Sequence, residues 1–280
     1  MYNKLKKAIC IHDISCLGRC SMQVITPMLS VLGVEPCVLP TALLSTHTGG
    51  FDDFTFLDLS DEMIKILNHW KQLNLEFDAV YSGFLANEKQ IDIVNNAIDD
   101  FGEQLVLVDP VMGDNGHVYS TYTPLMCERM KYLVSRADII TPNVTEAYIL
   151  ANRPHNDKPD IDELKDIAAE LGDMIQTKHK YSAVVITGIH KADQIGALIY
   201  DRKSNNFDFV SAPRCDCFFP GTGDIFASIL LGKILNDENI NIAARIAVDF
   251  ISETSFYTRK AGTPTRDGLE FENQLYKLNQ

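Results

Sequence analysis

Apolar and polar positions alternate along the chain in two rhythms, which predict strands and helices in turn. Short apolar runs rich in β-branched residues, such as those at 105–109 and 183–187, predict strands that are buried on both faces. The longer stretches between them repeat their apolar residues every three or four positions, which is typical of amphipathic helices. Strands that alternate with covering helices form a doubly wound, mostly parallel α/β sheet, so this is the predicted fold class.

Predicted strands cover residues 8–13, 36–42, 79–83, 105–109, 138–141, 183–187, 196–201 and 207–212, and predicted helices cover residues 21–32, 61–73, 88–101, 123–135, 145–151, 160–177, 224–235 and 242–258. Two segments, 37–56 and 195–219, break the alternation, and the second contains two runs close enough for an antiparallel pair. We expect these additions to form a small lid over the ends of the parallel strands, where open α/β sheets bind ligands. Because no repeat, low-complexity tract or linker interrupts the sequence, we expect one domain over residues 1–280.

Composition narrows the functional class. The chain has 25 basic and 38 acidic residues, so its net charge is −13, and 46% of its residues are hydrophobic. These values are typical of a soluble globular protein, exclude a disordered or fibrous one, and argue against nucleic acid as a partner. No apolar stretch reaches the roughly 20 residues that span a bilayer, and the first residues lack the apolar core of a signal peptide. We therefore expect a cytoplasmic protein with no membrane partner.

The seven cysteines include no CxxC pair and indicate neither a disulfide framework nor a zinc site. Cys215 and Cys217 lie just before a glycine-rich segment. A thiol there could add to an aldehyde, but a packing role is favoured because only Arg214 is adjacent to activate it.

The strongest chemical signal is the glycine-rich segment Phe219-Pro220-Gly221-Thr222-Gly223-Asp224 at the start of a predicted helix. Glycines let the backbone approach a ligand closely, and the free amides and positive dipole of a helix start attract an anion. We expect that helix start to keep Asp224 ionised, where it could take a proton from an alcohol that attacks a phosphoryl group. Asp224 could equally act only as a helix cap.

Two further polar segments follow predicted strands. Asp109-Pro110-Val111-Met112-Gly113-Asp114 offers two carboxylates that could hold Mg²⁺ or its waters beside nucleotide phosphates, although it could also be a simple polar turn. In Thr141-Pro142-Asn143-Val144-Thr145-Glu146, either Asn143 or Thr141 could cap the next helix while Glu146 reaches the same cavity. A capping box explains this second segment equally well.

A fourth polar cluster, Ser45-Thr46-His47-Thr48-Gly49, has hydroxyl and imidazole groups suited to hydrogen bonding with a polar ring. A histidine in a loop can also be merely solvated. The chain contains neither GxxxxGK[ST] nor the protein-kinase signature set, which excludes those two kinase classes.

With GTGD late in the chain, DPVMGD in its middle and TPNVTEA after the next strand, the sequence resembles the ribokinase superfamily over nearly its whole length. Ser82-Gly83-Phe84, DPVMGD and STHTG together resemble pyridoxal kinases. That resemblance implies a ribokinase-like fold and a transferase that uses MgATP to phosphorylate the 5′-hydroxymethyl group of pyridoxal, pyridoxine or pyridoxamine in vitamin B6 salvage. It also implies a homodimer and, in some members, a monovalent cation.

The resemblance implies a role for each matching residue. Asp224 would be the base, and the amides of Gly221, Thr222 and Gly223 would form the anion hole. Metal would be held by Asp109, Asp114 and Glu146; ATP would be contacted by Asp114, Tyr119, Thr141, Asn143, Glu146, Thr187 and Gly188; and the substrate would be contacted by Asp13, His47, Thr48 and Phe84.

Two positions depart from the pyridoxal kinase pattern. Asp13 stands where many members have Ser, and with Ser15 and Gly18 it forms a D-x-S-x-x-G arrangement that looks more like hydroxymethylpyrimidine kinases of thiamin synthesis. Phe84 stands where Tyr is common, which keeps a stacking face but removes a hydroxyl. A pyrimidine kinase is therefore the main alternative, followed by a non-catalytic binder of a B6 vitamer or nucleotide and by a sugar kinase.

Overall fold

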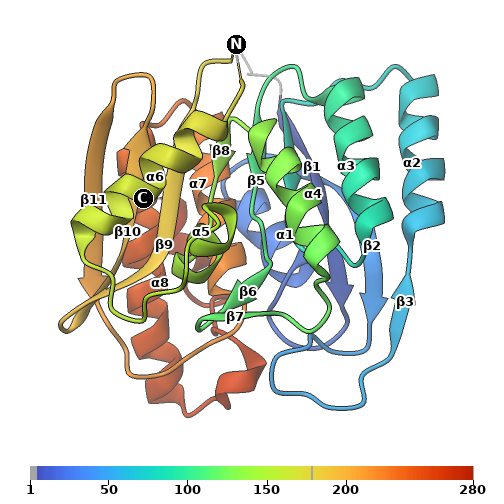
Figure 1. The fold of residues 1–280 in the computed structure, drawn as a ribbon. Coiled ribbons are helices and arrows are strands. Elements are labelled where there is room, and N and C mark those ends of the chain that lie inside the picture. The colour runs from blue at the N-terminus through green and yellow to red at the C-terminus, as the bar shows by residue number, and fades with distance from the viewer. Residues whose placement is uncertain (1–4, 178, 280) are drawn as a thin grey trace.

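The computed structural model describes residues 5–177 and 179–279, and its centre is one large sheet with helices on both faces (Figure 1). The strands of this sheet are β1 (Lys6–Ser15), β2 (Val34–Leu44), β3 (Phe56–Asp58), β4 (Ala79–Ser82), β5 (Val106–Val108), β8 (Ile139–Ile140), β9 (Ala183–Lys191), β10 (Gln194–Asp201) and β11 (Asn206–Pro213), and β6 (Gly113–Asp114) pairs separately with β7 (His117–Val118). The helices are α1 (Met22–Val31), α2 (Ser60–Gln72), α3 (Glu88–Phe101), α4 (Pro124–Ser135), α5 (Val144–Leu150), α6 (Ile161–Met174), α7 (Thr222–Leu235) and α8 (Ile240–Ala261), with short 3₁₀ helices η1 (Thr265–Asp267) and η2 (Leu275–Asn279).

The sheet has the strand order β11-β10-β9-β8-β5-β4-β1-β2-β3. From β9 to β2 the neighbouring strands run parallel, whereas β3, β10 and β11 pair antiparallel at the two edges. The chain leaves β1 toward β2 on one side and later returns to β4 on the other. The carboxyl ends of β1 and β4 therefore flank a topological switch point, the place where sheets of this kind bind ligands.

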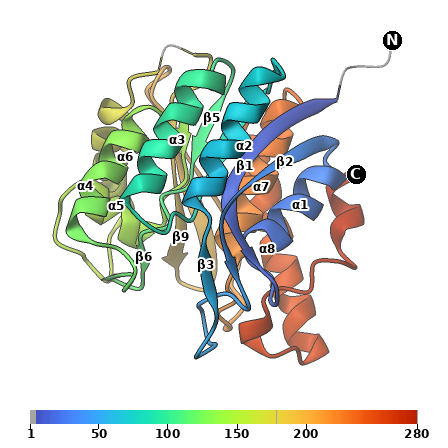
Figure 2. The same cartoon turned by 90° about the vertical axis from the view of Figure 1, so that its right-hand side faces the viewer.

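Two apolar cores lie on the two faces of the sheet. Side chains alternate between the faces of a strand, so Ala8 and Cys10 of β1 join the core beneath α1, α7 and α8, while Ile9 and Ile11 join the core beneath α2 to α6. Figure 2 shows these two helix layers edge-on. Helix α7 is apolar around almost its whole circumference because other elements enclose it, and this rigid burial fixes the position of its amino end.

Every strand and helix predicted from the sequence overlaps an element of the structure, which confirms the fold class. Strand β3, the β6–β7 hairpin and the two 3₁₀ helices were not predicted. The antiparallel pair within 195–219 is confirmed as β10 and β11, but it extends the edge of the large sheet and does not cross the strand ends. Its inner strand is long and apolar enough to be covered as part of the sheet.

The other segment expected to form a lid contains β2 itself and the loop 45–55, which lies at the carboxyl edge of the parallel strands, as does the β6–β7 hairpin (Figure 1). All seven cysteines are free. Within residues 5–177 and 179–279, no helix combines the length and apolar character that membrane crossing requires.

Candidate active site

The glycine-rich segment forms an open helix start at the switch point. Gly221 is the residue before α7 and has φ +79°, a left-handed conformation that favours glycine. A Cβ atom there would lie 2.0 Å from the carbonyl oxygen of Arg19, so no larger residue fits. No side chain caps α7, and the amides of Thr222 and Gly223 in its first turn are therefore open to an anion.

Asp224 lies in the same turn, with its side chain only 15% exposed. Its Oδ2 accepts a hydrogen bond from the Ser21 amide at 2.8 Å, and its Oδ1 lies 4.0 Å from Nδ1 of His12. Burial, reinforced by the negative charge of Asp13, raises the pKa of Asp224 to about 7, against the opposing effect of the Ser21 hydrogen bond. Burial therefore acts against the ionised form of Asp224 that the helix start is expected to favour.

Asp13 approaches Asp224 from the end of β1 and is itself buried. Its Oδ2 accepts a hydrogen bond from the Ser15 hydroxyl at 2.8 Å, and its Oδ1 accepts one from the Ser21 hydroxyl. Burial raises the pKa of the Asp13 carboxyl, while these hydrogen bonds and the nearby His47 act in the opposite direction. The Asp13 carboxylate of the D-x-S-x-x-G segment is thus held by two hydroxyl groups, that of Ser15 within the segment and that of Ser21 beyond it.

His47 is buried beside this carboxylate, and both of its ring nitrogens are already bonded to the backbone. Nε2 lies 2.7 Å from the carbonyl oxygen of Arg266, and Nδ1 accepts from the Gly49 amide at 3.1 Å, an arrangement that requires the proton on Nε2. The ring also packs edge-on against Phe51 and closely against Gly18. His47 therefore shapes the rim of the site, and Thr48, the next residue, is exposed.

A cluster of carboxyl groups lies at the carboxyl ends of β5 and β8. Asp109 is buried and has its pKa raised, first by burial and then by Glu146 and Asp224. Glu146 is buried too, and burial raises its pKa to about 7. Its two oxygens accept hydrogen bonds from the Met112 and Asn143 amides, both at 2.9 Å, so Glu146 fixes the loop that follows Asp109.

Asp114 lies at the edge of this cluster and accepts the Asn115 amide at 2.8 Å. Burial raises the pKa of Asp114. Among the described residues, no group of three His, Cys, Asp or Glu side chains is placed to hold a metal ion by itself. One or two carboxylates, such as those of Asp109 and Asp114, suit Mg²⁺, which commonly completes its shell with phosphate oxygens and water.

The Asn143 segment is a capping box that also ties three strands together. Asn143 accepts the Glu146 amide, and its own side-chain amide donates to the Gly113 carbonyl at 2.8 Å. The amide of Thr187 donates to the Pro142 carbonyl, which brings the middle of β9 to the same edge. Gly188 follows at φ +72° with open space around it, and Thr141 is buried beside Asp109.

The hairpin after Asp109 carries Tyr119 to the rim of the cluster. Asn115 and Gly116 have φ +52° and +79°, the combination found in a tight two-residue hairpin turn. The amide of Tyr119 donates to the Met112 carbonyl at 2.9 Å, and burial together with the carboxylates of Glu146 and Asp114 raises the pKa of its phenol. The Asn-Gly pair was the signal from which the hairpin could have been predicted.

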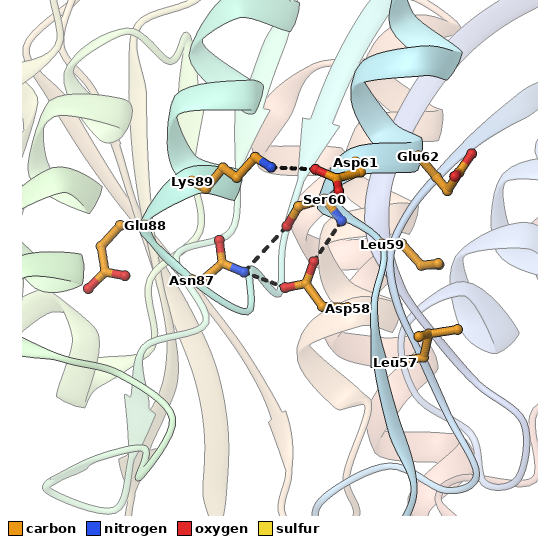
Figure 3. Close-up of a pocket in the computed structure, with 9 residues that line it drawn as sticks. All are labelled: Leu57, Asp58, Leu59, Ser60, Asp61, Glu62, Asn87, Glu88 and Lys89. Atoms are coloured by element: carbon orange, nitrogen blue, oxygen red, sulfur yellow. Dashed lines mark hydrogen bonds and ion pairs between the residues drawn. The ribbon is translucent and has the colours of Figure 1, made fainter.

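Phe84 follows β4 and is half-buried, in a loop held by a polar network at the starts of α2 and α3. Gln90 accepts the Ala86 amide and donates to the Thr41 carbonyl and the Ser60 hydroxyl, all within 3.1 Å. The Thr41 hydroxyl donates to the Phe84 carbonyl at 3.2 Å. Asn87 joins Ser60 to Asp58, and an ion pair of Lys89 with Asp61 lies beside them, along a surface pocket of about 610 Å³ (Figure 3).

Comparison with known proteins agrees with this geometry. Residues 28–265 match the family model described as phosphomethylpyrimidine kinase. The chain belongs to that family. A Bacteroides thetaiotaomicron protein provisionally assigned as a phosphomethylpyrimidine kinase, in a crystal form with pyridoxal, is 36% identical, with a TM-score of 0.90 over 99% of this chain and 96% of the other.

Two more relatives are named for different substrates. The crystal structure of pyridoxal kinase from Lactobacillus plantarum is 28% identical, with a TM-score of 0.91 over 98% of this chain and 97% of that one. Hydroxymethylpyrimidine/phosphomethylpyrimidine kinase of Bacillus subtilis is 28% identical over 80% of this chain and 79% of its own. The resemblance to ribokinase-like pyridoxal kinases is confirmed, and the protein is a phosphotransferase of this family.

Two residues at the centre of the site, His12 and Ser21, were not predicted from the sequence. His12 is fully buried, packs edge-on against Tyr81 and has no hydrogen-bond partner on either ring nitrogen within the described structure. Burial lowers the pKa of His12 to about 3, so the ring is neutral. Ser21 links two carboxylates, and no sequence motif marks it, because the link depends on how distant segments meet.

Cys215 is buried, and its thiol donates to the Ser255 carbonyl at 3.8 Å. Burial raises its pKa, which disfavours the reactive thiolate. These contacts favour the packing role over the nucleophilic one.

Proposed function

We propose that the protein transfers the γ-phosphoryl group of ATP to the 5′-hydroxymethyl group of a vitamin B6 vitamer. The observation that carries the proposal is the position of Asp224: a largely shielded carboxyl group in the first turn of α7, beside an open amide cradle and close to Asp13. The hydroxyl oxygen of an alcohol bound between Asp224 and the cradle would have its proton on the Asp224 side. The γ-phosphorus that it attacks would lie on the cradle side.

In the proposed step, the substrate hydroxyl oxygen forms a bond to the γ-phosphorus while the bond from that phosphorus to the bridging oxygen of ADP breaks. The hydroxyl proton passes to Asp224 Oδ1, since Oδ2 is held by the Ser21 amide. A pKa of about 7 lets this carboxyl both accept the proton and release it near neutral pH. The amides of Gly221, Thr222 and Gly223 would stabilise the charge on the transferred group.

The acidic cluster fits a magnesium ion that arrives with the nucleotide. Asp109 is the carboxylate best suited to bind it, because Glu146 and Asp114 already accept backbone amides. When bound, Mg²⁺ would neutralise phosphate charge. Glu146 would hold the Asp109 loop in place. The nucleotide side of the site would be lined by Asn143, Thr187, Gly188, Thr141 and Tyr119.

On the ring side, Asp13 offers a carboxylate to a polar ring substituent, and Phe84 offers an aromatic face. His47 would shape this pocket through the loop 45–55, whose backbone it holds. An Asp near the ring also suits the cationic amine of pyridoxamine, so Asp13→Asn should reduce any preference for that vitamer.

Hydroxymethylpyrimidine is the alternative substrate. The D-x-S-x-x-G arrangement and the Bacillus subtilis relative favour it, and the catalytic end of the site would be unchanged. Both substrates are flat heteroaromatic rings that carry a hydroxymethyl group.

A coupled ADP-release assay with MgATP distinguishes these substrates. We expect the highest kcat/KM with pyridoxal, pyridoxine or pyridoxamine. A higher kcat/KM with hydroxymethylpyrimidine would retain the mechanism and assign the protein to pyrimidine phosphorylation. Binding of a vitamer without turnover would instead favour the non-catalytic alternative.

A further inference from the structure

Ser21 has a backbone conformation that serine rarely adopts. Its φ is +51° and its ψ −131°, in a region that favours glycine, and the residue is 7% exposed. Such a conformation is strained in serine and persists only where surrounding contacts impose it.

Helix α1 does not account for this conformation. Ser21 directly precedes α1, a position where serine commonly accepts a hydrogen bond from a helix amide, yet its side chain makes no capping bond. Its carbonyl oxygen accepts the Val24 and Ile25 amides and so starts the helix. The amide and the hydroxyl group are left for other partners.

Both of those groups donate to carboxylates of the candidate active site. The Ser21 amide donates to Asp224 Oδ2 at 2.8 Å, and the Ser21 hydroxyl donates to Asp13 Oδ1. The two carboxylates come from α7 and β1, which lie near opposite ends of the chain. Because one residue supplies both donors, Ser21 links the Asp13 carboxylate to the Asp224 carboxylate through a single side chain and its own backbone.

We infer that Ser21 is a positioning residue that couples recognition of the substrate ring at Asp13 to the orientation of the base Asp224. This inference deepens the proposed function and rests on it. When a ring substituent binds Asp13, Ser21 keeps the Asp13 carboxylate and the Asp224 carboxylate in one fixed geometry, so that Asp224 Oδ1 faces the hydroxymethyl group. Hydrogen bonds to charged groups are strong enough to carry such coupling.

Two substitutions separate the hydroxyl from the backbone geometry. Ser21→Gly removes the hydroxyl but adopts φ +51° without strain, so the amide stays on Asp224. Ser21→Ala removes the same hydroxyl, but alanine is strained at this φ. Without the hydroxyl contact to hold it there, the backbone should relax and its amide should leave Asp224. Ser30→Ala, at an exposed position on α1, is the matched control.

We expect both Ser21 variants to raise the KM for the vitamer about tenfold, since each removes one hydrogen bond to a carboxylate. Only Ser21→Ala should lower kcat by about tenfold or more, whereas Ser21→Gly should keep kcat within about threefold of the wild type. The KM for MgATP should not change in either variant. A helix-starting role alone would affect neither kcat nor the vitamer KM selectively.

A double-mutant cycle tests the coupling itself. Asp13→Asn combined with Ser21→Ala should lose less kcat/KM than the product of the two separate losses, because the second change removes an interaction that is already broken. Multiplicative losses, or Ser21 variants that match Ser30→Ala, would overturn the inference while wild-type turnover still supports the proposed function. Absence of wild-type turnover would overturn both.

Discussion

The burial of Asp224 in the candidate active site lowers the stability of the folded protein when this carboxyl group is ionised. Its pKa rises from 3.8 in the unfolded chain to about 7 on folding, so the folded state holds a proton that the unfolded state has lost between those pH values. Stability is therefore lost as the pH rises through this window, and the full penalty, up to about 4 kcal/mol, is present above pH 7.

Asp224→Asn should remove that penalty, because the amide group is neutral at every pH. We expect the variant to be more stable than the wild type at about pH 8, by about 1–4 kcal/mol, and nearly equal to it at about pH 4. Urea unfolding at both pH values measures this difference. Asp173→Asn is the control: Asp173 is exposed and its ion pair with Arg202 contributes little, so this change should leave stability nearly unaltered at both pH values. An Asp224→Asn variant that is less stable at the higher pH would contradict a burial cost at this site.

At the residue scale, sequence predicts the groups whose chemistry is encoded locally. The proposed base and the glycine-rich helix start are separated by only two residues, so one short motif contains both Asp224 and Gly221. The same is true of the Asn143–Glu146 capping box. His12 and Ser21 acquire their roles from burial and from contacts across the fold, which no local pattern contains. His47 lies near Asp13, but both of its ring nitrogens are hydrogen-bonded to the backbone, which its sequence position does not reveal.

At the element scale, the start of α7 depends on one glycine. Gly221→Ala should strain φ and push a Cβ atom into the Arg19 carbonyl, which would displace the anion cradle. We expect kcat to fall by about 10²–10³-fold, the range seen when donors to a transition-state anion are lost.

Gly262 provides a matched control for this substitution. It has φ +78° at the end of α8, and a Cβ atom added to it would meet no other atom within 4 Å, so Gly262→Ala introduces the backbone strain without the clash. The control should lose about 1 kcal/mol of stability and keep its kcat. Equal kinetic losses in the two variants would show that the cradle geometry is not required.

A separate prediction concerns Gln90, in the polar network at the starts of α2 and α3. Gln90→Leu leaves the Ala86 amide, the Thr41 carbonyl and the Ser60 hydroxyl without their partner, which should cost about 2–4 kcal/mol of stability. Because Thr41 also holds the Phe84 loop, the KM for the vitamer should rise while that for MgATP stays constant.

Lys89→Ala is the control for this network, since the Lys89–Asp61 ion pair is exposed and contributes little. Thermal unfolding and steady-state kinetics of the two variants check the prediction. A Gln90→Leu protein with wild-type stability would mean that water replaces the lost contacts.

Elements were predictable where periodicity extends over several residues. All eight α-helices of the described chain were expected, because each buries one face or is wholly enclosed. Strand β3 has only three residues, all exposed, so it carries no apolar alternation. The place of β10 and β11 at the sheet edge depends on pairing with β9, which the sequence of either strand does not specify.

At the scale of the whole molecule, the parallel sheet brings distant segments to one edge. β1 supplies Asp13, β4 leads to Phe84, β5 leads to Asp109, and α5 and α7 supply Glu146 and Asp224. Strand alternation predicts a sheet, but the strand order that makes β1 and β4 neighbours is a property of the complete fold. The order creates the switch point and thereby concentrates negative charge where MgATP would supply its counter-ion.

The most direct test of a kinase that uses Asp224 as its base is the kcat of Asp224→Asn in the ADP-release assay with MgATP and the best vitamer. Asn preserves the size of the side chain and can still accept the Ser21 amide. We predict that kcat falls by about 10²–10⁴-fold while the KM values for the vitamer and MgATP change little. A variant that turns over at close to the wild-type rate would contradict the role of Asp224.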